Sequence, residues 1–332
     1  MTTASILLTV GTAWGVPSEK VEENKDKGAR NIQLIAAREL RETPATREQA
    51  LRIMREWIQK NQDIRNVRQD DTFLLRFLRH KKFSIPMAQQ TLLKYLSLKK
   101  YYPQIFSKLD SEDPKVEEIL QSGYMMVSPV RDRDGRRVIV YAMGRFNAAK
   151  YNCWDMSRVH ALVYESLLED PTDQVCGFTH VGDGSGVSGA HITTWNPTDF
   201  ARLMKWGEQS MPIRHKAFYL VNVPSALKYI IDFAISKVTP KMAERLHTFT
   251  NVKQMLKHID PACLPTSHGG TIPIDEMIEF TRTLLSEQRK KILGLDDMEI
   301  LSTRGINSSR KGPAVKSDVG SIEGSFRKLD ID

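Results

Sequence analysis

From residue 31 to about residue 107, apolar residues recur at the three- and four-residue spacing of amphipathic helices. In the stretch REQALRIMREWIQKN, Leu51, Met54 and Ile58 fall on one stripe. The stretch DDTFLLRFLRHKKF repeats the spacing behind two aspartates that are suitable N-caps, and IPMAQQTLLKYLSLKKYYPQIF gives a further amphipathic helix. We therefore predict an all-helical N-terminal module over residues 31–112.

The pattern changes after residue 112, where β-branched runs alternate with helical stretches. Three runs are typical of strands: RRVIVYAMGRF at 136–146, QVCGFTHVGD at 174–183 and HKAFYLVNVP at 215–224. The helical patterns DMSRVHALVYESLLED and NPTDFARLMKWGEQSMP separate them. This alternation predicts an α/β domain with a mostly parallel sheet over residues 113–276, followed by a C-terminal helix at 277–294.

The two ends of the chain lack such patterns. Residues 1–30 hold one short apolar run with no basic residue before it and then a charged stretch, so we expect a flexible tail and not a signal peptide. Residues 295–332 are rich in Ser, Gly and Lys, and we expect a second flexible tail there. No window reaches the roughly 20 apolar residues that cross a bilayer, so any contact with a membrane is expected at its surface.

One helical stretch, ALKYIIDFAIS at residues 226–236, is apolar over most of its surface. Its polar residues Lys228, Asp232 and Ser236 are four apart and form one narrow stripe. Two interpretations fit: a helix buried on two sides, or a lid that faces a cavity on one side and a membrane on the other. Lys241 and Arg245 follow at helical spacing, which predicts a second helix with a cationic face suited to acidic lipid.

Composition narrows the choice of partners. The 332 residues carry a formal net charge of +8, which favours an anionic partner such as nucleic acid, a phosphorylated ligand or an acidic membrane. The aromatic residues Phe73, Phe77 and Phe83 lie at core spacing, which argues against stacking on RNA bases. The three cysteines are far apart, which argues against a disulfide framework or a zinc site and fits a reducing compartment.

Two motifs resemble catalytic or cofactor sites but lack the expected context. The stretch GSGVSG at 184–189 fits a dinucleotide-binding loop, and Ser188 with nearby His191 approaches the pattern of a nucleophile elbow. Both sites require a helix directly afterwards, whereas AHITTWNP reads as β-branched and broken by proline. We therefore expect neither a nucleotide cofactor nor catalysis, and no metal-binding motif occurs in the sequence. A serine hydrolase built on Ser188 remains a remote alternative.

Several longer motifs occur together and in a fixed order. They are DDTFLLRFLRHKKFSIPMAQQTLLKYL, RRVIVYAMGRF, VGDGSG, VNVPSALKYIIDFAISKVTPKMAERLH and LPTSHGGTIPI. Over residues 51–280 the chain thereby resembles the CRAL-TRIO family of lipid-transfer proteins, close to the branch of alpha-tocopherol transfer protein, cellular retinaldehyde-binding protein and clavesin. The sequence departs from the family at Ser267 and His268, where Glu-Tyr is usual, and at Gly184, where an apolar residue is usual.

The resemblance implies an α/β domain that holds one lipid in a cavity, behind an N-terminal helical module and under a mobile gate helix from Ser225 to about Arg245. His160 and Tyr164 would contact a ligand head group, unless they bond each other or the backbone. The full set of expected lipid-binding residues is His160, Ala161, Tyr164, Phe178, Val187, Leu203, Trp206, Phe218, Leu227, Ile230, Ile231, Phe233, Ala234 and Val238.

The resemblance also implies a basic patch that reads phosphoinositide head groups. The expected residues are Lys81, Arg214, Lys216, Lys241 and Arg245. We therefore expect a cytoplasmic, peripherally membrane-associated carrier for one tocopherol-, retinoid- or carotenoid-like lipid, acting as a monomer without metal, cofactor or nucleic acid. Transfer of phosphatidylinositol or another phospholipid, or sensing of phosphoinositides, is the alternative.

Overall fold

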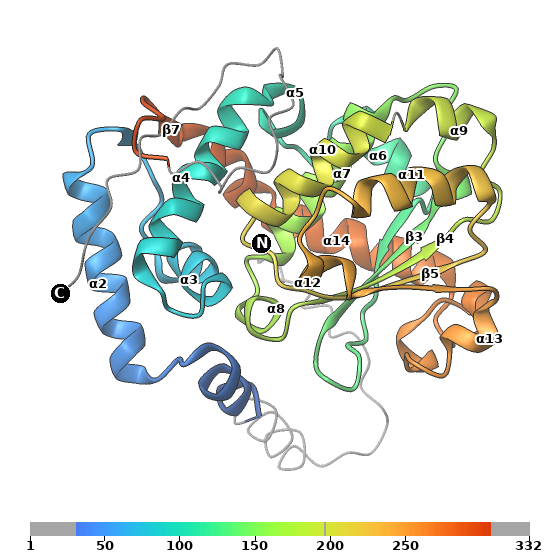
Figure 1. Cartoon of the computed structure of the whole chain (residues 1–332), viewed down its shortest axis with the longest axis horizontal. Helices are drawn as coiled ribbons and strands as arrows, with labels where there is room; N and C mark the ends of the chain where they lie inside the picture. The colour runs from blue at the N-terminus through green and yellow to red at the C-terminus, as the bar shows by residue number, and fades with distance from the viewer. Residues whose placement is uncertain (1–30, 196, 307–332) are drawn as a thin grey trace, which may run out of the picture.

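The computed structural model describes residues 31–195 and 197–306, apart from the side chains of Phe200 and Trp206. The predicted tail at 1–30 and the end of the chain from 307 lie outside these residues. The N-terminal module is helical, as predicted (Figure 1). A short π-helix, η1 (Ala36–Leu40), precedes α2 (Pro44–Lys60), α3 (Asp71–His80) and α4 (Ile85–Tyr101). Asp70 caps α3 by accepting the N–H of Phe73 at 3.0 Å, as its position before the apolar run suggested.

A five-stranded sheet in the order β2-β3-β4-β5-β6 forms the centre of the second domain. Strands β3 (Arg137–Ala142), β4 (Phe178–Asp183) and β5 (His215–Val221) are the three predicted strands, and they are parallel. The edge strands were not predicted: β2 (Met125–Val127) pairs antiparallel with β3, and β6 (Leu246–Phe249) pairs parallel with β5. The predicted α/β class with a mostly parallel sheet is confirmed.

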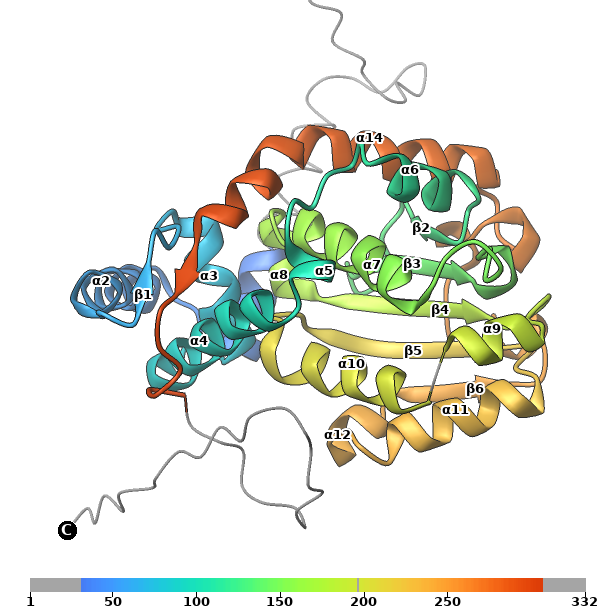
Figure 2. The ribbon, with the colours of Figure 1, turned by 90° about the horizontal axis from the view of Figure 1, so that it is seen from above.

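The alternation of side chains along each strand gives the sheet two different faces. On one face, Val138, Val140 and Val181 pack against α13 (Val252–Met255) and residues 259–277. On the other face lie α7 (Cys153–Leu167), α10 (Pro197–Ser210) and α11 (Ser225–Ile235), of which α10 and α11 are neighbours (Figure 2). The shorter elements are α5 (Pro103–Phe106), α6 (Pro114–Gln121), η2 (Met143–Arg145), α8 (Pro171–Cys176), α9 (Gly189–Thr194), α12 (Pro240–Ala243), η3 (Pro261–Cys263) and η4 (Thr266–His268).

Helix α14 (Ile274–Leu293) runs from the sheet towards the helical module and ends in η5 (Gly294–Asp297). The chain then forms β7 (Glu299–Ile300), which pairs antiparallel with β1 (Ile64–Arg65) of the N-terminal module. We had expected a flexible tail from residue 295, but residues 295–306 pack against the protein. Leu295, Met298 and Ile300 are buried there, and this apolar burial accounts for the order of the segment.

The segment after α11 also differs from the prediction. Lys241 and Arg245 do not share one helical face, because α12 ends at Ala243 and Arg245 directly precedes strand β6. The helical spacing of Met242 and Leu246 favours a longer helix, but residues 246–249 form strand β6, which pairs with the edge of β5. Among the described helices, none is both long and apolar enough to span a bilayer.

Candidate functional site

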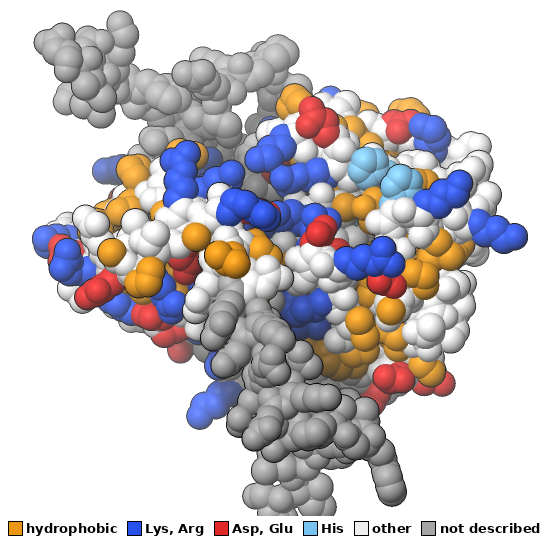
Figure 3. Space-filling model, turned by 90° about the horizontal axis from the view of Figure 1, so that it is seen from below, with side chains coloured by type: hydrophobic (Ala, Val, Ile, Leu, Met, Phe, Trp, Pro, Cys, Tyr) orange, Lys and Arg blue, Asp and Glu red, His pale blue; other side chains and the backbone are white. Residues whose placement is uncertain are grey.

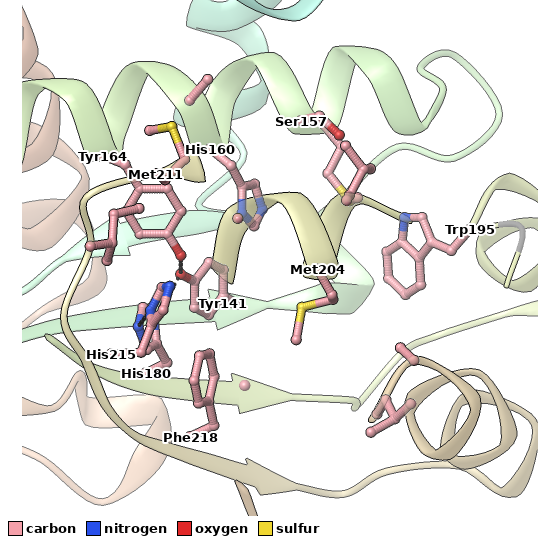
Figure 4. A pocket seen from close by; sticks show the side chains of 18 of the residues that line it. Tyr141, Ser157, His160, Tyr164, His180, Trp195, Met204, Met211, His215 and Phe218 are labelled. Atoms are coloured by element: carbon pink, nitrogen blue, oxygen red, sulfur yellow. Dashed lines mark hydrogen bonds between the residues drawn. The ribbon is translucent and has the colours of Figure 1, made fainter. Parts of the chain in front are cut away.

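A cavity of about 250 Å³ lies between the second face of the sheet and helices α7, α10 and α11 (Figure 4). Its lining is largely apolar, and the described lining residues include no Asp, Glu, Lys or Arg. Apolar side chains of α11 close one side, while rings from α7 and the strands form the other. Such a chamber suits an apolar guest, because any charged group inside it would lose its hydration without gaining a counter-ion.

Most of the residues predicted to bind lipid lie at this cavity. Those that line it are His160, Ala161, Tyr164, Leu203, Phe218, Leu227, Ile230, Ile231 and Ala234. The stripe predicted on α11 from helical spacing thus faces inward, whereas Tyr229 on its other side is 68% exposed.

Four predicted residues lie elsewhere. Phe178 is fully buried in the core at the start of β4, with its ring centre 6.4 Å from that of Tyr164. Val187 packs at the margin of the same core, and half-buried Phe233 lies under the ammonium group of Lys237 at 5.0 Å. Val238 is half-buried beyond the end of α11 and does not line the cavity. The side chain of Trp206 lies outside the described set.

Four polar rings that line the cavity are joined by consecutive hydrogen bonds. The hydroxyl groups of Tyr164 and Tyr141 are 2.7 Å apart, and Tyr141 is 3.0 Å from Nδ1 of His180. Nε2 of His180 is in turn 2.8 Å from Nδ1 of His215. We call these four side chains the polar chain. Figure 4 shows them converging at one side of the cavity, with Trp195 at the other.

Only Tyr164 of the polar chain was predicted from the sequence. Tyr141, His180 and His215 were missed because polar residues on strands usually face solvent, whereas here they face a covered cavity. The available signal was the alternation with valine: Val140 and Val181 point to the opposite face, so Tyr141 and His180 must point to this one.

The rings of the site are held neutral by burial. Burial lowers the pKa of His160 to about 4, and burial followed by the charge of Arg245 lowers that of His215 to about 3. The pKa of His180 is also far below its usual value, first because of burial and then because of the neighbouring imidazoles. Burial raises the pKa of Tyr164 to about 12. At neutral pH the cavity therefore offers hydrogen bonds without formal charge.

His160 forms a separate pair, with Nε2 2.8 Å from the hydroxyl of Tyr124. His160 and Tyr164 do not bond each other, although their rings meet edge to face with centres 6.2 Å apart. Each instead uses a tyrosine of the sheet side as its partner. Tyr124, which lies just before β2, is a further lining residue that the sequence analysis missed.

The five residues predicted to bind phosphoinositide gather near the start of β5. Arg214 directly precedes that strand and Lys216 is its second residue, and both bond the carboxylate of Glu39 on η1, at 2.8 and 2.6 Å. Burial raises the pKa of Glu39, but its bond to Lys216 and the charges of both cations lower the pKa overall. The carboxylate of Glu39 thus forms ion pairs with two of the five basic residues.

The other three cations lie beside this pair. Arg245 donates to the backbone carbonyl of His215, and its charge acts on Arg214. Burial lowers the pKa of Lys81, as do the charges of Lys94 and Lys241, while the charge of Glu208 opposes them, so all three of these groups lie near Lys81. Lys241 is exposed and has no ion pair among the described residues. Figure 3 shows Lys and Arg side chains gathered across the middle of the lower face of the molecule.

The GSGVSG loop is followed by a helix, contrary to our expectation, since α9 begins at Gly189. Ser188 caps this helix: Nδ1 of His191 accepts the N–H of Ser188 at 3.1 Å and lies 2.9 Å from its hydroxyl. Nε2 of His191 is 2.9 Å from the backbone carbonyl of Phe146, which it bonds as donor. The amide that begins α9 is therefore already used by an imidazole. Within the described residues, no cluster of three potential metal ligands occurs.

Comparison with known proteins agrees with this architecture. Residues 121–270 match the family model of the CRAL/TRIO domain, and residues 43–116 match that of the Pinta-like UBA domain. The chain is 29% identical to Clavesin-1 of Xenopus laevis over 248 residues, which are 74% of this chain and 75% of that protein. It is 27% identical to Clavesin-2 of Homo sapiens over 251 residues, 75% of this chain and 77% of that protein. A solved structure titled "Crystal structure of Sfh5" aligns with 75% of this chain and 99% of its own, at 13% identity and a TM-score of 0.46.

Proposed function

We propose that this chain, whose residues 121–270 belong to the CRAL/TRIO domain family of lipid-binding proteins, carries one uncharged terpenoid-like lipid between membranes. The observation that supports this cargo is the cavity itself, which is apolar and, among its described residues, lined by no ionised side chain. A phospholipid placed entirely inside would bring a phosphate with no counter-ion. Tocopherols, retinoids and carotenoids have the required apolar body.

We propose that α11 is the gate of this cavity. Four of its residues, Leu227, Ile230, Ile231 and Ala234, line the cavity, while exposed Tyr229 is placed to enter a membrane interface. Burial of a C20 to C30 lipid at about 25 cal/mol per Å² contributes on the order of 10 kcal/mol. Release into water would then be slow, and a membrane must favour the open state for exchange to proceed.

The basic residues next to the gate are proposed to supply the membrane signal. Lys241 on α12 is exposed, and Lys81 lies within its electrostatic reach, so a phosphoinositide head group there would meet two cations close to α11. The protein would work in the cytoplasm, at the membrane surface and as a monomer.

Mass spectrometry of lipid extracted from the purified protein tests the cargo. We expect one uncharged lipid per chain. Recovery of a stoichiometric phospholipid would favour the alternative, a phospholipid exchanger, and an empty protein that accepts no lipid would overturn the carrier.

Transfer between vesicles with and without phosphoinositide tests the membrane step. Lys241→Ala should slow transfer about fivefold, the equivalent of about 1 kcal/mol per cation, while ligand affinity stays unchanged. Lys60→Ala, which removes an equal charge from the exposed end of α2, is the matched control. Equal effects of the two variants would contradict a specific role for α12.

We propose a carrier and not a catalyst. Although the hydroxyl of Ser188 lies near His191, the same imidazole nitrogen also accepts the amide of Ser188, as expected for a helix cap. A serine-reactive fluorophosphonate probe should therefore leave the protein unlabelled. Labelling that is lost in Ser188→Ala would instead support a hydrolase.

A further inference from the structure

Building on the proposed carrier function, we propose that the polar chain is the site that binds the polar end of the cargo. It accepts a single uncharged oxygen group, either a hydroxyl or a carbonyl, and rejects a carboxylate or a phosphate. The polar chain would thus select among lipids whose apolar bodies are alike.

The polar chain has one proton more than its internal hydrogen bonds use. It contains two hydroxyl groups and two neutral imidazoles, which together provide four protons, but three contacts join them, at 2.7, 3.0 and 2.8 Å. When Tyr141 donates to one neighbour and accepts from the other, the fourth proton stands at one end. The two ends are the hydroxyl of Tyr164 and Nε2 of His215.

In two arrangements of these protons all three bonds run in the same direction along the chain. In the first, Tyr164 donates to Tyr141, Tyr141 donates to Nδ1 of His180, and Nε2–H of His180 donates to Nδ1 of His215. The free proton is then on Nε2 of His215. In the second, every bond is reversed, and the free proton is on the hydroxyl of Tyr164. In both arrangements one end donates while the other accepts.

This property determines which head groups fit. A carbonyl needs a donor and a hydroxyl can use either, so reversal of the chain satisfies both classes at the same position. A carboxylate needs several donors or a cation, whereas each end supplies one donor at most and the described lining holds no Lys or Arg. Burial also keeps the pKa of His215 near 3, so the chain does not readily become cationic to receive an anion.

A network that only stabilised the fold would have its ends bonded to the protein. Here the hydroxyl of Tyr164 has Tyr141 as its partner, and Nε2 of His215 has no hydrogen-bond partner among the described residues. Both rings line the cavity. The unused capacity of the polar chain is therefore available to whatever fills the cavity.

The test uses three retinoids that share one apolar body: all-trans-retinol, all-trans-retinaldehyde and all-trans-retinoic acid. Binding to the full chain is measured by quenching of tryptophan fluorescence. We expect retinol and retinaldehyde to bind within about threefold of each other and retinoic acid at least about tenfold more weakly, which corresponds to one unsatisfied buried group. Tyr141→Phe, which interrupts the polar chain, should weaken binding of retinol and retinaldehyde about three- to tenfold. The difference in affinity between these two ligands and retinoic acid should therefore decrease.

Tyr219→Phe is the matched control, because Tyr219 lies on β5 but packs with the opposite face of the sheet. If retinoic acid binds as tightly as retinol, or if Tyr141→Phe behaves like Tyr219→Phe, head-group selection is wrong while the carrier function stands. If none of the three binds, the co-purified lipid decides. A lipid whose only polar group is a hydroxyl or carbonyl supports the inference, and a charged lipid overturns both it and the terpenoid cargo. A protein without any lipid overturns the carrier function itself.

Discussion

The two walls of the cavity are built in different ways. The inner wall, which consists of β3, β4, β5 and α7, is held by the backbone ladder of the sheet and by the hydrogen bonds of the polar chain. The outer wall, which consists of α10 and α11, meets the cavity through apolar side chains such as Ile230 and Leu203. Helix α7 has a capping box at Asn152, whereas α11 has Pro224 at its N-cap position and no side-chain cap.

This difference assigns separate tasks to the walls. Hydrogen bonds are directional, so the inner wall cannot shift without leaving buried polar groups unpaired. Apolar contacts are not directional, so the outer wall can slide or lift at a smaller cost, above all where lipid replaces the lost contacts. The inner wall is therefore suited to recognise a ligand and the outer wall to admit it.

The sharpest test compares the stability that one side chain contributes to each wall. Phe178→Ala in the inner wall should lower the free energy of unfolding by about 3–5 kcal/mol, because the fully buried ring leaves a cavity. Ile231→Ala in α11 should cost less than about 2 kcal/mol, because this side chain already borders a void. Urea unfolding measures both. Equal losses would show that α11 is packed as firmly as the sheet.

Acid should destabilise the inner wall, where three buried histidines lie. The pKa values of His160 and His215, about 4 and about 3, are below those of an unfolded chain, about 6.5. Between pH 6.5 and 4 the unfolded state binds more protons, so stability falls as the pH falls, by up to about 1.4 kcal/mol per pH unit for each histidine. Urea midpoints measured across this range check the slope. His160→Phe should reduce this slope by about the contribution of one histidine. An unchanged slope would contradict the burial of His160 in its neutral form.

Removal of the exposed ring from the outer wall should affect transfer but not binding. Tyr229→Ala is expected to slow exchange between vesicles about tenfold, since a ring of this size contributes about 1.5 kcal/mol on burial in the interface. Tyr101→Ala on α4 removes an exposed ring remote from α11 and serves as the control. A fall in ligand affinity without a fall in vesicle binding would place Tyr229 in cargo recognition instead.

The smallest expected effect concerns the acid that occupies the basic patch. Glu39→Gln should free Arg214 and Lys216 and tighten binding to phosphoinositide vesicles by up to about fivefold. Glu56→Gln on the exposed face of α2 changes the net charge equally and is the control. Sedimentation with vesicles measures both variants. Weaker binding by Glu39→Gln would mean that this carboxylate orders the patch and does not compete with lipid phosphate.

The sequence predicted the elements that have strong internal periodicity. The stripe on α11 and the three parallel strands follow from repeated spacing within one segment. Strands β2 and β6 were missed because each has four residues or fewer, too few for a clear alternation, and is stabilised by pairing with another strand. For the same reason, Lys241 and Arg245 were assigned to one helix: local spacing favoured it, while pairing with β5 determined the outcome.

Predictions for the site divided in a similar way. The apolar stripe on α11 followed from its spacing, whereas His160, Tyr164 and Leu203 followed from the family resemblance, and all of these residues line the cavity. The polar chain depends on three neighbouring strands in register, with Ile139 opposite His180 and His180 opposite Phe218. That register is a tertiary property, so the segment around His180 does not by itself reveal which side chains of other strands lie beside it.

The pairing of β1 with β7 sets the order in which the protein can be completed during synthesis. Arg65 bonds Glu299, 234 positions later, and the backbone N–H of Leu301 donates to Asp63 at 2.7 Å. During synthesis the N-terminal module therefore leaves the ribosome before strand β7 exists. The pairing of β1 with β7 can form only after the whole second domain has been synthesised. Strand β7, which completes the N-terminal module, is thus the last described strand to be translated.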